Sequence, residues 1–476
     1  MKNFIAAFLL SSSLSAVAQN TNQEQINHTF YNKVEFFINS QQTDSIYTLA
    51  NDNFKRANPY SSFKNQLENE IYPLGRIQHA EKLNFQDGIT QYRIDFKEKS
   101  YQIPFGVDST LHYHTFGFQP ISKPVAEKEL PVITNTVVEN KVDFFIDSIA
   151  NFYTKKGNTE SLTIGIIKNG QLSTYFYGET EKGNTTLPTS STLYEIGSLS
   201  KIFTATLLAD LVEKGTLDLD QPIIDFLPDS LKTNISLQKI TFKSLANHTS
   251  GLPRLPDNME KVKGFDVNNP YKDYNQKYLY QYLATFKSKH ESGEDYEYSN
   301  LGYALLGDII TSLTNKSYNT NIQEIIAKPL GLVATSDLLN PKTQQLPKVY
   351  NIKGEETTAW DFQTFSPAGG LKSTVTDLLT FAQVQFKMPE TSLENAMALT
   401  RQFTYFLPPN TDIGLAWHMD LLDDITYCYH TGGTGGSSSF IAIAPDTKTA
   451  VVLLSNAAES VEKIGTSIFH MLLTQK

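Results

Sequence analysis

The sequence predicts a mixed α/β (α+β) protein: a small cone-shaped N-terminal α+β domain, then a larger domain in which helices flank one antiparallel sheet. With 476 residues, the chain exceeds what a single hydrophobic core usually serves. Helical patterns precede strand-like runs in roughly the first 120 residues, an order typical of α+β domains. In the remainder, strand-like runs lie near both ends of a long, mainly helical stretch, so we expect the two ends to form one sheet.

The first 18 residues have the layout of a cleavable secretory signal. Lys2 precedes a short apolar run, and a Ser-rich stretch leads to Ala16-Val-Ala18. We predict cleavage near Ala18 and a secreted or periplasmic protein. The apolar run is too short to span a bilayer, and no cysteine near the cut is present to take a lipid, so we expect no stable membrane anchor.

The composition excludes several classes of partner. The net charge is −10 at pH 7 and no basic run occurs, which argues against nucleic acid and against an anionic membrane surface. Cys428 is the only cysteine, so an internal disulfide is excluded. It lies in a strand-like run and is interpreted as a buried small apolar residue. No cofactor is expected, and nothing indicates an oligomeric state.

Residues 19–120 are predicted to form the accessory domain. Helical patterns cover residues 30–39, 45–55 and 62–72, and strand-like runs cover residues 76–83, 89–96, 101–105 and 111–119. This order resembles the SnoaL-like, cystatin-like domains found beside secreted hydrolases. His112 and His114 alternate on the last run, which would place two imidazoles on one face. Two ligands do not complete a metal site, and we predict a metal-independent protein.

A Pro-rich segment of alternating charge, residues 121–137, is predicted to be an extended linker. The second domain, residues 138–476, opens with a helical pattern and a hairpin whose turn is Asn169-Gly170. Its predicted elements are a helix at 139–155, hairpin strands at 162–168 and 171–177, strands at 414–419, 427–430, 438–444 and 449–454, and a helix at 461–473.

Ser198 and Lys201 lie in Glu195-Ile-Gly-Ser-Leu-Ser-Lys201, at the start of a run that is apolar nearly all round and stops at Gly215. Such a run predicts a helix through the core. Residues three apart share a helix face, so the Lys201 amine can reach the Ser198 hydroxyl. Burial would lower the pKa of Lys201 and make it a base for a serine nucleophile.

Tyr298-Ser-Asn300 ends a polar loop that leads directly into an apolar helix. A tyrosine beside Ser198 and Lys201 can serve as a phenolate base or a proton shuttle, and Asn300 can hold Lys201 and a substrate carbonyl. The alternative interpretation is that Asn300 only caps the following helix.

His430-Thr-Gly-Gly433 begins a glycine-rich segment between two strand-like runs. A phosphate-binding loop would lead into a helix, whereas this segment leads into a strand. The glycines therefore favour a substrate that lies against a sheet edge, where backbone N–H groups can bind it.

These three motifs resemble those of the serine β-lactamase and penicillin-binding-protein superfamily, nearest the class C β-lactamases and D-alanyl-D-alanine carboxypeptidases. Residues 247–253 and 366–373 are similar to stretches common in this group. The resemblance covers about residues 137–476. It implies the β-lactamase/DD-peptidase fold, with an antiparallel sheet flanked by helices and a helical subdomain. Within the two stretches, His248 and Gly369-Gly370 are interpreted as structural residues of a turn and a helix end.

The resemblance implies that Ser198 is the acylated nucleophile and that Lys201 and Tyr298 share proton transfer, with the choice of base left open. It implies an oxyanion hole formed by the backbone N–H groups of Ser198 and Gly433. Thr431, and His430 less directly, would face a substrate carboxylate. The substrate-binding residues that it implies are Asn300, His430, Thr431, Gly432 and Gly433.

His430 stands where class C β-lactamases usually have lysine. With an ordinary pKa of about 6.5, histidine is mostly neutral at neutral pH and attracts a carboxylate less strongly. In this superfamily, histidine here is familiar from D-Ala-D-Ala peptidases, D-aminopeptidases and esterases. We therefore expect a serine hydrolase of D-Ala-D-Ala-type peptides, related to cell-wall peptidoglycan. The alternatives are a β-lactamase or carboxylesterase, which would take a β-lactam or ester substrate, and, from another class, a penicillin-binding sensor without turnover or a binding protein.

Overall fold

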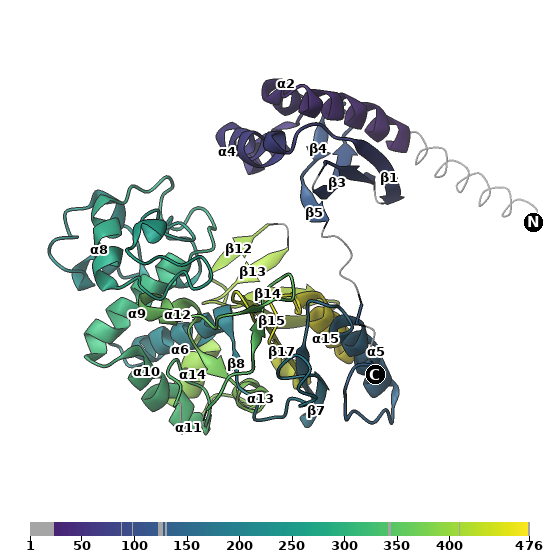
Figure 1. The fold of residues 1–476 in the computed structure, drawn as a ribbon. Helices are drawn as coiled ribbons and strands as arrows, with labels where there is room; N and C mark the ends of the chain where they lie inside the picture. Colours follow the sequence, from purple (N-terminus) through teal and green to yellow (C-terminus); the bar gives the residue numbers. More distant parts are fainter. Residues whose placement is uncertain are drawn as a thin grey trace, which may run out of the picture. The chain divides into compact units, whose positions relative to one another are not determined.

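The computed structural model describes residues 23–86, 88–97, 99–121, 127–128, 131–340, 344–408 and 410–474. The predicted signal segment, residues 1–18, lies outside these ranges. The chain divides into two compact units, Met1–Val125 and Ala126–Lys476 (Figure 1).

The N-terminal unit places helices first and an antiparallel sheet second. Residues 23–39 are helical. The helices that follow are α2 (Thr43–Thr48), α3 (Asp52–Ala57) and α4 (Tyr60–Gln66), which continues through η1 (Leu67–Ile71) and η2 (Tyr72–Leu74). The strands are β1 (His79–Gln86), β2 (Ile89–Asp95), β3 (Ser100–Val107), β4 (Tyr113–Thr115) and β5 (Gln119–Ile121), with β4 and β5 both paired to β3. The fold is therefore α+β, as predicted.

One face of the helix at residues 23–39 packs against this sheet. Tyr31, Val34 and Ile38 recur at helical spacing and are almost completely buried. The Tyr31 ring stacks on Tyr92 of β2 with 3.7 Å between ring centroids. Aromatic side chains thus fill the interior of the unit.

The strand predicted at residues 111–119 forms only in part, as β4 at residues 113–115, because a turn at Asp108 delays its start. The Asp108 carboxylate accepts hydrogen bonds from the backbone N–H groups of Thr110 and His112. His112 therefore precedes β4 instead of alternating with His114, and both imidazoles are exposed. Among the described residues, no three His, Cys, Asp or Glu side chains are arranged to hold a metal ion.

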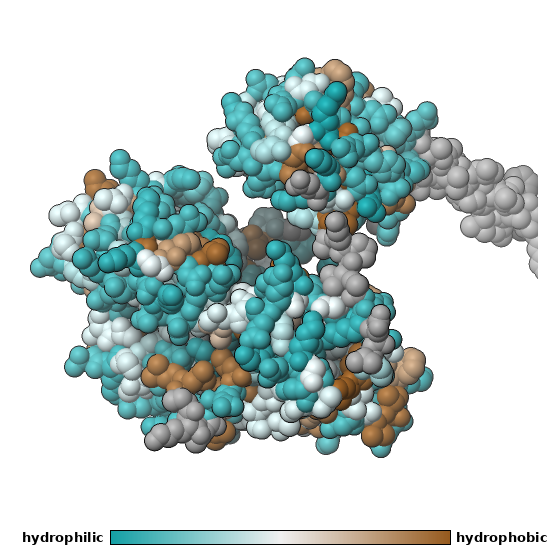
Figure 2. All heavy atoms as spheres, in the orientation of Figure 1, coloured by the Kyte–Doolittle hydropathy of each residue, from teal (hydrophilic) through white to brown (hydrophobic). Residues whose placement is uncertain are grey.

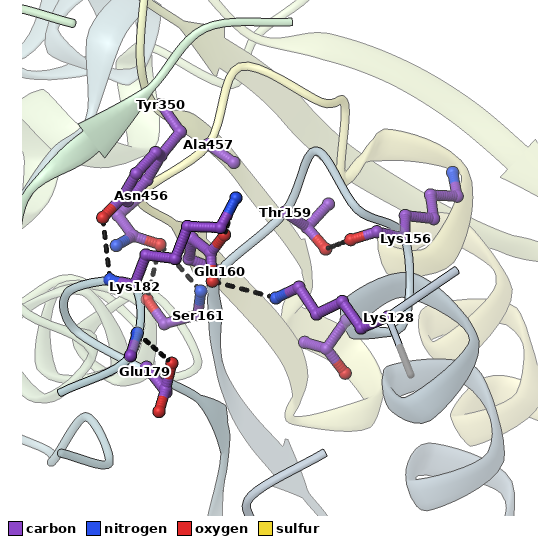
Figure 3. A network of polar contacts seen from close by, with 12 residues as sticks. Lys128, Lys156, Thr159, Glu160, Ser161, Glu179, Lys182, Tyr350, Asn456 and Ala457 are labelled. Atoms are coloured by element: carbon purple, nitrogen blue, oxygen red, sulfur yellow. Dashed lines mark hydrogen bonds and ion pairs between the residues drawn. The ribbon is translucent and has the colours of Figure 1, made fainter. Parts of the chain in front are cut away.

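Part of the predicted linker is attached to the second unit (Figure 3). The backbone N–H of Lys128 donates to the Lys155 carbonyl, and the Ile133 carbonyl accepts from Gly178. The Lys128 ammonium lies 2.9 Å from the Glu160 carboxylate, which is 1% exposed. These contacts fix Lys128 to residues 155 and 160, and Ile133 to Gly178.

The second unit is built on an eight-stranded antiparallel sheet. Its order is β12 (Tyr405–Leu407), β13 (Thr411–Ile413), β14 (His418–Leu422), β15 (Ile425–Gly433), β16 (Ser438–Ala444), β17 (Thr449–Ser455), β6 (Ser161–Lys168) and β7 (Gln171–Gly178). Strand β17 pairs with β6, so the two ends of the unit meet in one sheet. This confirms the predicted assembly.

Helices cover both faces of this sheet. In β17, Val451 and Leu453 pack towards α5 (Lys141–Thr154) and α15 (Glu462–Thr474), whereas Val452 and Leu454 pack towards α6 (Ser200–Glu213) and α13 (Val375–Val384). Strand side chains alternate between faces, so burial on both faces requires the continuous apolar run seen in the sequence.

The strand predicted at residues 414–419 is wrong for residues 414–417, and only its last two residues lie in a strand. Strand β13 ends at Ile413 and β14 begins at His418, and the residues between them form a bend with Ala416 at φ +69°. Their backbone N–H groups bond outside the sheet: Leu415 to the Thr400 carbonyl and Ala416 to the Ala246 carbonyl. The run is apolar because it is buried against the helices.

The remaining helices form the helical part of the unit, with α6 and α9 at its centre (Figure 1). They are α7 (Phe242–Ala246), α8 (Gln276–Thr285), α9 (Asn300–Thr314), α10 (Tyr318–Asn321), α11 (Lys328–Leu330), α12 (Ser366–Gly369) and α14 (Ser392–Leu399). Two short strand pairs lie outside the eight-stranded sheet. They are β8 (Tyr194–Glu195) with β11 (Lys372–Ser373) and β9 (Val349–Tyr350) with β10 (Glu356–Thr357).

The face of the molecule in Figure 2 is mostly hydrophilic, with hydrophobic residues in small separate patches. Within the described ranges, every helix is too short or too polar to cross a membrane. Cys428 is free and buried, as predicted, and burial raises the pKa of its thiol to about 12.

Candidate active site

Ser198 lies in a 3₁₀ turn, η3 (Gly197–Leu199), immediately before helix α6. Nearly every residue of α6 is buried, which explains why the run is apolar all round. Lys201, in the first turn of α6, is 0% exposed, and its Nζ lies 3.1 Å from Ser198 Oγ. The Ser198 side chain keeps partial access to solvent. The structure therefore brings together a reachable hydroxyl and a buried amine.

Two acceptors hold the Lys201 amine. Its Nζ donates to Asn300 Oδ1 at 2.8 Å and to the Ala368 carbonyl at 2.7 Å. No carboxylate pairs with Lys201 anywhere in the described ranges. Burial, and to a smaller extent the positive charge of Arg254, lowers the pKa of Lys201 well below its usual value.

Tyr298 lies beside this pair, at the end of the loop that precedes α9. Lys201 Nζ is 4.8 Å from the centroid of the Tyr298 ring. Burial raises the pKa of the Tyr298 phenol to about 12, although a hydrogen-bonding interaction with Ser198 opposes this rise. The phenol is therefore protonated at neutral pH.

Asn300 is not the cap of α9. Ser299 is the cap, and its hydroxyl accepts from the backbone N–H of Gly302 at 2.8 Å. The Asn300 amide is buried and free for other contacts: its oxygen accepts from Lys201 and its nitrogen donates to the Tyr271 hydroxyl at 3.2 Å. The capping interpretation of Asn300 is thus wrong.

His248 fixes the Tyr298 loop. It has φ +64°, and its Nδ1 accepts from the backbone N–H of Ser299 at 3.0 Å. Its ring lies 4.3 Å from the Tyr298 ring, measured between centroids. Burial, followed by the neighbouring charge of Lys201, lowers the pKa of His248 well below its usual value, so the imidazole is neutral. His248 therefore has a structural role, and part of that role is to orient the Tyr298 side chain.

The third motif forms the end of β15. Residues 425–429 of β15 pair with β14, but the pairing with β16 continues to Gly433, so residues 430–433 have one unpaired edge. A Cβ atom on Gly432 would lie 2.2 Å from the Ile196 carbonyl oxygen, and one on Gly197 would lie 2.6 Å from Gly433 N. The glycines thus allow this strand to approach the Ser198 turn.

His430 is 2% exposed, and its Nδ1 lies 2.6 Å from the Thr431 carbonyl oxygen. Burial, together with the neighbouring His418 and Lys201, lowers the pKa of His430 well below its usual value. The imidazole is neutral and supplies no fixed charge. Thr431 is partly exposed on the same strand.

Two residues near the site were missed in the sequence. Glu195 is 2% exposed and accepts from Trp360 N, Thr434 Oγ1 and Ser437 Oγ, which joins the Ser198 segment to the loop after β15. Its signal was a carboxylate inside an apolar stretch. Arg254 directly follows the stretch at residues 247–253, and its Cζ lies 5.1 Å from the Tyr298 ring centroid. Only its position after that stretch could have indicated it.

Comparison with known proteins agrees with this arrangement. The profile of the β-lactamase family matches residues 139–473, and the chain therefore belongs to the β-lactamase family, whose members with this site are serine hydrolases.

Two curated relatives illustrate the range of the similarity. The protein flp of Staphylococcus aureus (strain MRSA252) is 28% identical over 344 residues, which cover 68% of this chain and 66% of that protein. The chain thus spans slightly less than two thirds of this relative. A β-lactamase of Providencia stuartii is 28% identical over 364 residues, covering 69% of this chain and 90% of that protein.

Solved structures share the fold. A β-lactamase/D-alanine carboxypeptidase from Pseudomonas syringae has a TM-score of 0.63 at 23% identity, covering 71% of this chain and 100% of its own. A class C β-lactamase has a TM-score of 0.63 at 24% identity, and the match covers 72% of this chain and 98% of that chain. The β-lactamase fold and the superfamily predicted from the motifs are both confirmed.

Proposed function

We propose that the protein is a secreted serine hydrolase that forms an acyl-enzyme on Ser198 and acts on peptides ending in D-Ala-D-Ala or on related D-amino-acid peptides. The observation that carries the proposal is the set of three contacts made by Lys201 Nζ, with Asn300 Oδ1, the Ala368 carbonyl and Ser198 Oγ. The secretion part depends on the signal-like first 18 residues.

The hydrogen count at Lys201 supports this residue as the base. A neutral amine has two hydrogens and one lone pair. Two contacts, at 2.8 and 2.7 Å, are to oxygens that can only accept, so they use both hydrogens. In the neutral amine the lone pair is then left for the third contact, so that the Ser198 hydroxyl can donate to Nζ across the 3.1 Å between Nζ and Ser198 Oγ. Because burial already favours the neutral amine, we assign proton removal to Lys201.

Tyr298 then acts as the proton donor. A phenol with a pKa of about 12 keeps its proton at neutral pH and cannot be the resting base. Placed beside Ser198 and Lys201, it can pass a proton to the leaving group when the tetrahedral intermediate collapses, and later help to activate the water that releases the acyl group.

The developing oxyanion is assigned to two backbone donors, the N–H groups of Ser198 and Gly433. Support for this pair comes from the close approach of Gly433 N to the Gly197 backbone, which brings the end of β15 to the Ser198 turn. Donors that are fixed before the reaction stabilise the transition state without reorganisation. The unpaired edge of residues 430–433 would bind the substrate backbone, with Thr431 facing its terminal carboxylate.

The neutral state of His430 favours the peptidase over the β-lactamase assignment, because no fixed cation occupies the third motif. A β-lactamase activity remains the second candidate, since the Providencia β-lactamase matches over 90% of its length. Turnover of nitrocefin, a p-nitrophenyl ester and a D-Ala-D-Ala peptide by the same preparation would rank β-lactamase, esterase and peptidase.

Intact-protein mass spectrometry tests the proposal. The protein, expressed with its first 18 residues so that their removal is also read from the mass, is mixed with a fluorescent penicillin or a fluorophosphonate, beside Ser198→Ala. We expect one covalent adduct on the wild type and none on the variant. Equal labelling of both, or no labelling, would contradict the acyl-enzyme. An adduct that forms but does not decay would replace the hydrolase with a penicillin-binding sensor.

A further inference from the structure

The Arg254 side chain occupies an unusual position above the site. Its guanidinium carbon lies 5.1 Å from the Tyr298 ring centroid, and the residue is exposed. The Arg254 carbonyl accepts from the backbone N–H groups of Asn300 at 3.1 Å and Leu301 at 3.3 Å. The backbone of Arg254 is thus fixed to the start of α9, and its side chain covers the tyrosine of the second motif.

The guanidinium has no anionic partner. Within the described ranges, no carboxylate pairs with it, and its one close contact is the face of an aromatic ring. A guanidinium carries five N–H donors in a planar fork that matches a carboxylate. A cation–π contact at an exposed site contributes only about 0.5–1 kcal/mol. It leaves the N–H donors in the plane of the guanidinium unused. Arg254 therefore presents unused donors beside the reacting groups.

The charges around Ser198 make this cation significant. Burial lowers the pKa of Lys201, His248 and His430 well below the usual values, which weakens the positive charge that these three groups can supply. A site of this kind has little attraction for an anion through those three groups. In the described part of the chain, Arg254 is the fixed positive charge in contact with the catalytic residues.

We propose that Arg254 binds a carboxylate on the acyl part of the substrate, so that the enzyme selects acyl donors that carry a negative charge on that side. The inference rests on the proposed function of Ser198 and adds to it the class of acyl group. Arg254 belongs to the α9 side of the site together with Asn300, whereas Thr431 belongs to β15 and is assigned to the carboxylate of the leaving group. The favoured peptide would thus carry an acidic side chain upstream of the cleaved bond.

Arg254 also acts on the pKa of Lys201, and this effect must be separated from binding. Its charge contributes to the lowered pKa of Lys201, so removal of the charge would slow every substrate at low pH. A direct contact with the substrate would change only substrates that carry the acyl carboxylate. Two substrates that differ in that group alone therefore distinguish the two roles.

The matched substrates are 4-nitrophenyl hydrogen glutarate and its methyl ester, which share a leaving group and differ by one negative charge. The variants are Arg254→Gln, Arg254→Lys and, as control, Lys263→Gln, which removes an exposed positive charge from the same segment. Rates are measured on the pH plateau of each variant, so that a changed Lys201 pKa does not contribute. A thermal melt of each variant verifies folding.

We expect Arg254→Gln to lower kcat/KM for the free acid about 10- to 100-fold, mainly through KM, which is the range for a hydrogen bond to a charged group. The methyl ester should change less than about threefold, and Arg254→Lys should lie between, because an ammonium keeps the charge but not the fork. Added salt should reduce the preference of the wild type.

Equal losses for both esters, or a wild type without preference for the free acid, would overturn the assignment of Arg254. Such a result would leave the role of Ser198 intact as long as Ser198→Ala abolishes turnover. If neither ester is cleaved in a Ser198-dependent manner, the proposed function itself fails.

Discussion

Substitution of Asn300 by aspartate is the sharpest test of the proton count at Lys201. The change replaces one amide nitrogen by oxygen and leaves the size of the side chain unaltered. Asn300 Oδ1 lies 2.8 Å from Lys201 Nζ in a buried setting. If the new carboxyl is ionised, Lys201 holds a third proton and has no lone pair for Ser198. The ionised form therefore removes the base, and the short distance to Lys201 favours that form.

The size of the effect follows from the distance. Two unit charges 2.8 Å apart attract by about 6 kcal/mol at an effective dielectric constant of about 20. This energy corresponds to about four orders of magnitude in the protonation equilibrium of Lys201. A positioned general base contributes about 10²- to 10⁴-fold to rate. We therefore expect kcat/KM of Asn300→Asp to fall at least about 100-fold at pH 7.

The assay is kcat/KM against pH, from pH 5 to 10, with a p-nitrophenyl ester. In the wild type the rate should rise as the Lys201 ammonium loses its proton and then stay level, because the Tyr298 phenol titrates only near 12. In Asn300→Asp the rise should move to higher pH, and recovery of activity there would show that the variant is folded. Asn315→Asp, an exposed change at the other end of α9, is the control. An unaltered profile in Asn300→Asp would refute Lys201 as the base.

Three further predictions concern other parts of the site. Tyr298→Phe should lower kcat about 100-fold or more without moving the pH at which the rate rises, because the phenol is protonated throughout that range; a moved rise would indicate that Tyr298 is the base. Gly197→Ala should lower kcat about 10²- to 10³-fold, because its Cβ would lie 2.6 Å from Gly433 N. Gly215→Ala, which also has a positive φ but open space around it, should only destabilise the fold. Equal kcat values in the two variants would contradict the assigned oxyanion hole. Since the pKa of His248 is lowered in the folded state, the unfolded chain binds more protons as pH falls below about 6.5, and stability should decrease there by up to about 1.4 kcal/mol per pH unit. Chemical denaturation of the wild type and His248→Gln from pH 4.5 to 7.5 gives the free energy of unfolding against pH. The slope should be smaller in His248→Gln than in the wild type, and equal slopes would argue against a neutral buried imidazole.

The parts of the fold that could be predicted are those where burial and periodicity agree. Strands β16 and β17 are buried on both faces, and their continuous apolar runs predicted them almost to the residue. Residues 414–417 are equally apolar, yet they bend, because the N–H groups of Leu415 and Ala416 bond to carbonyls of the helical part. Periodicity does not distinguish a buried strand from a buried bend when the partners lie far away in sequence.

The candidate site divides in a similar way. Motif spacing identified Ser198 and Lys201 because both lie within one helical turn. Tyr298 and the residues of β15 were recognised through family resemblance, since no local pattern brings them to Ser198. The role of Glu195 depends on contacts with residues 165 to 242 positions away, and that of Arg254 depends on a single aromatic ring. Such contacts leave no periodic signal in the sequence.

The segment at residues 366–373 shows why a helix end can matter for catalysis. Gly369-Gly370 within it were interpreted as the residues of a helix end, and the geometry agrees, with α12 ending at Gly369. Yet the Ala368 carbonyl accepts one of the two Lys201 hydrogens, and the backbone N–H of Leu371 donates to Ser200 Oγ at 3.0 Å. The same few residues therefore hold the Lys201 amine and fix Ser200 in the first turn of α6. Both contacts are made by backbone groups of this segment. The shape of the helix end, more than the identity of its side chains, thus positions Lys201.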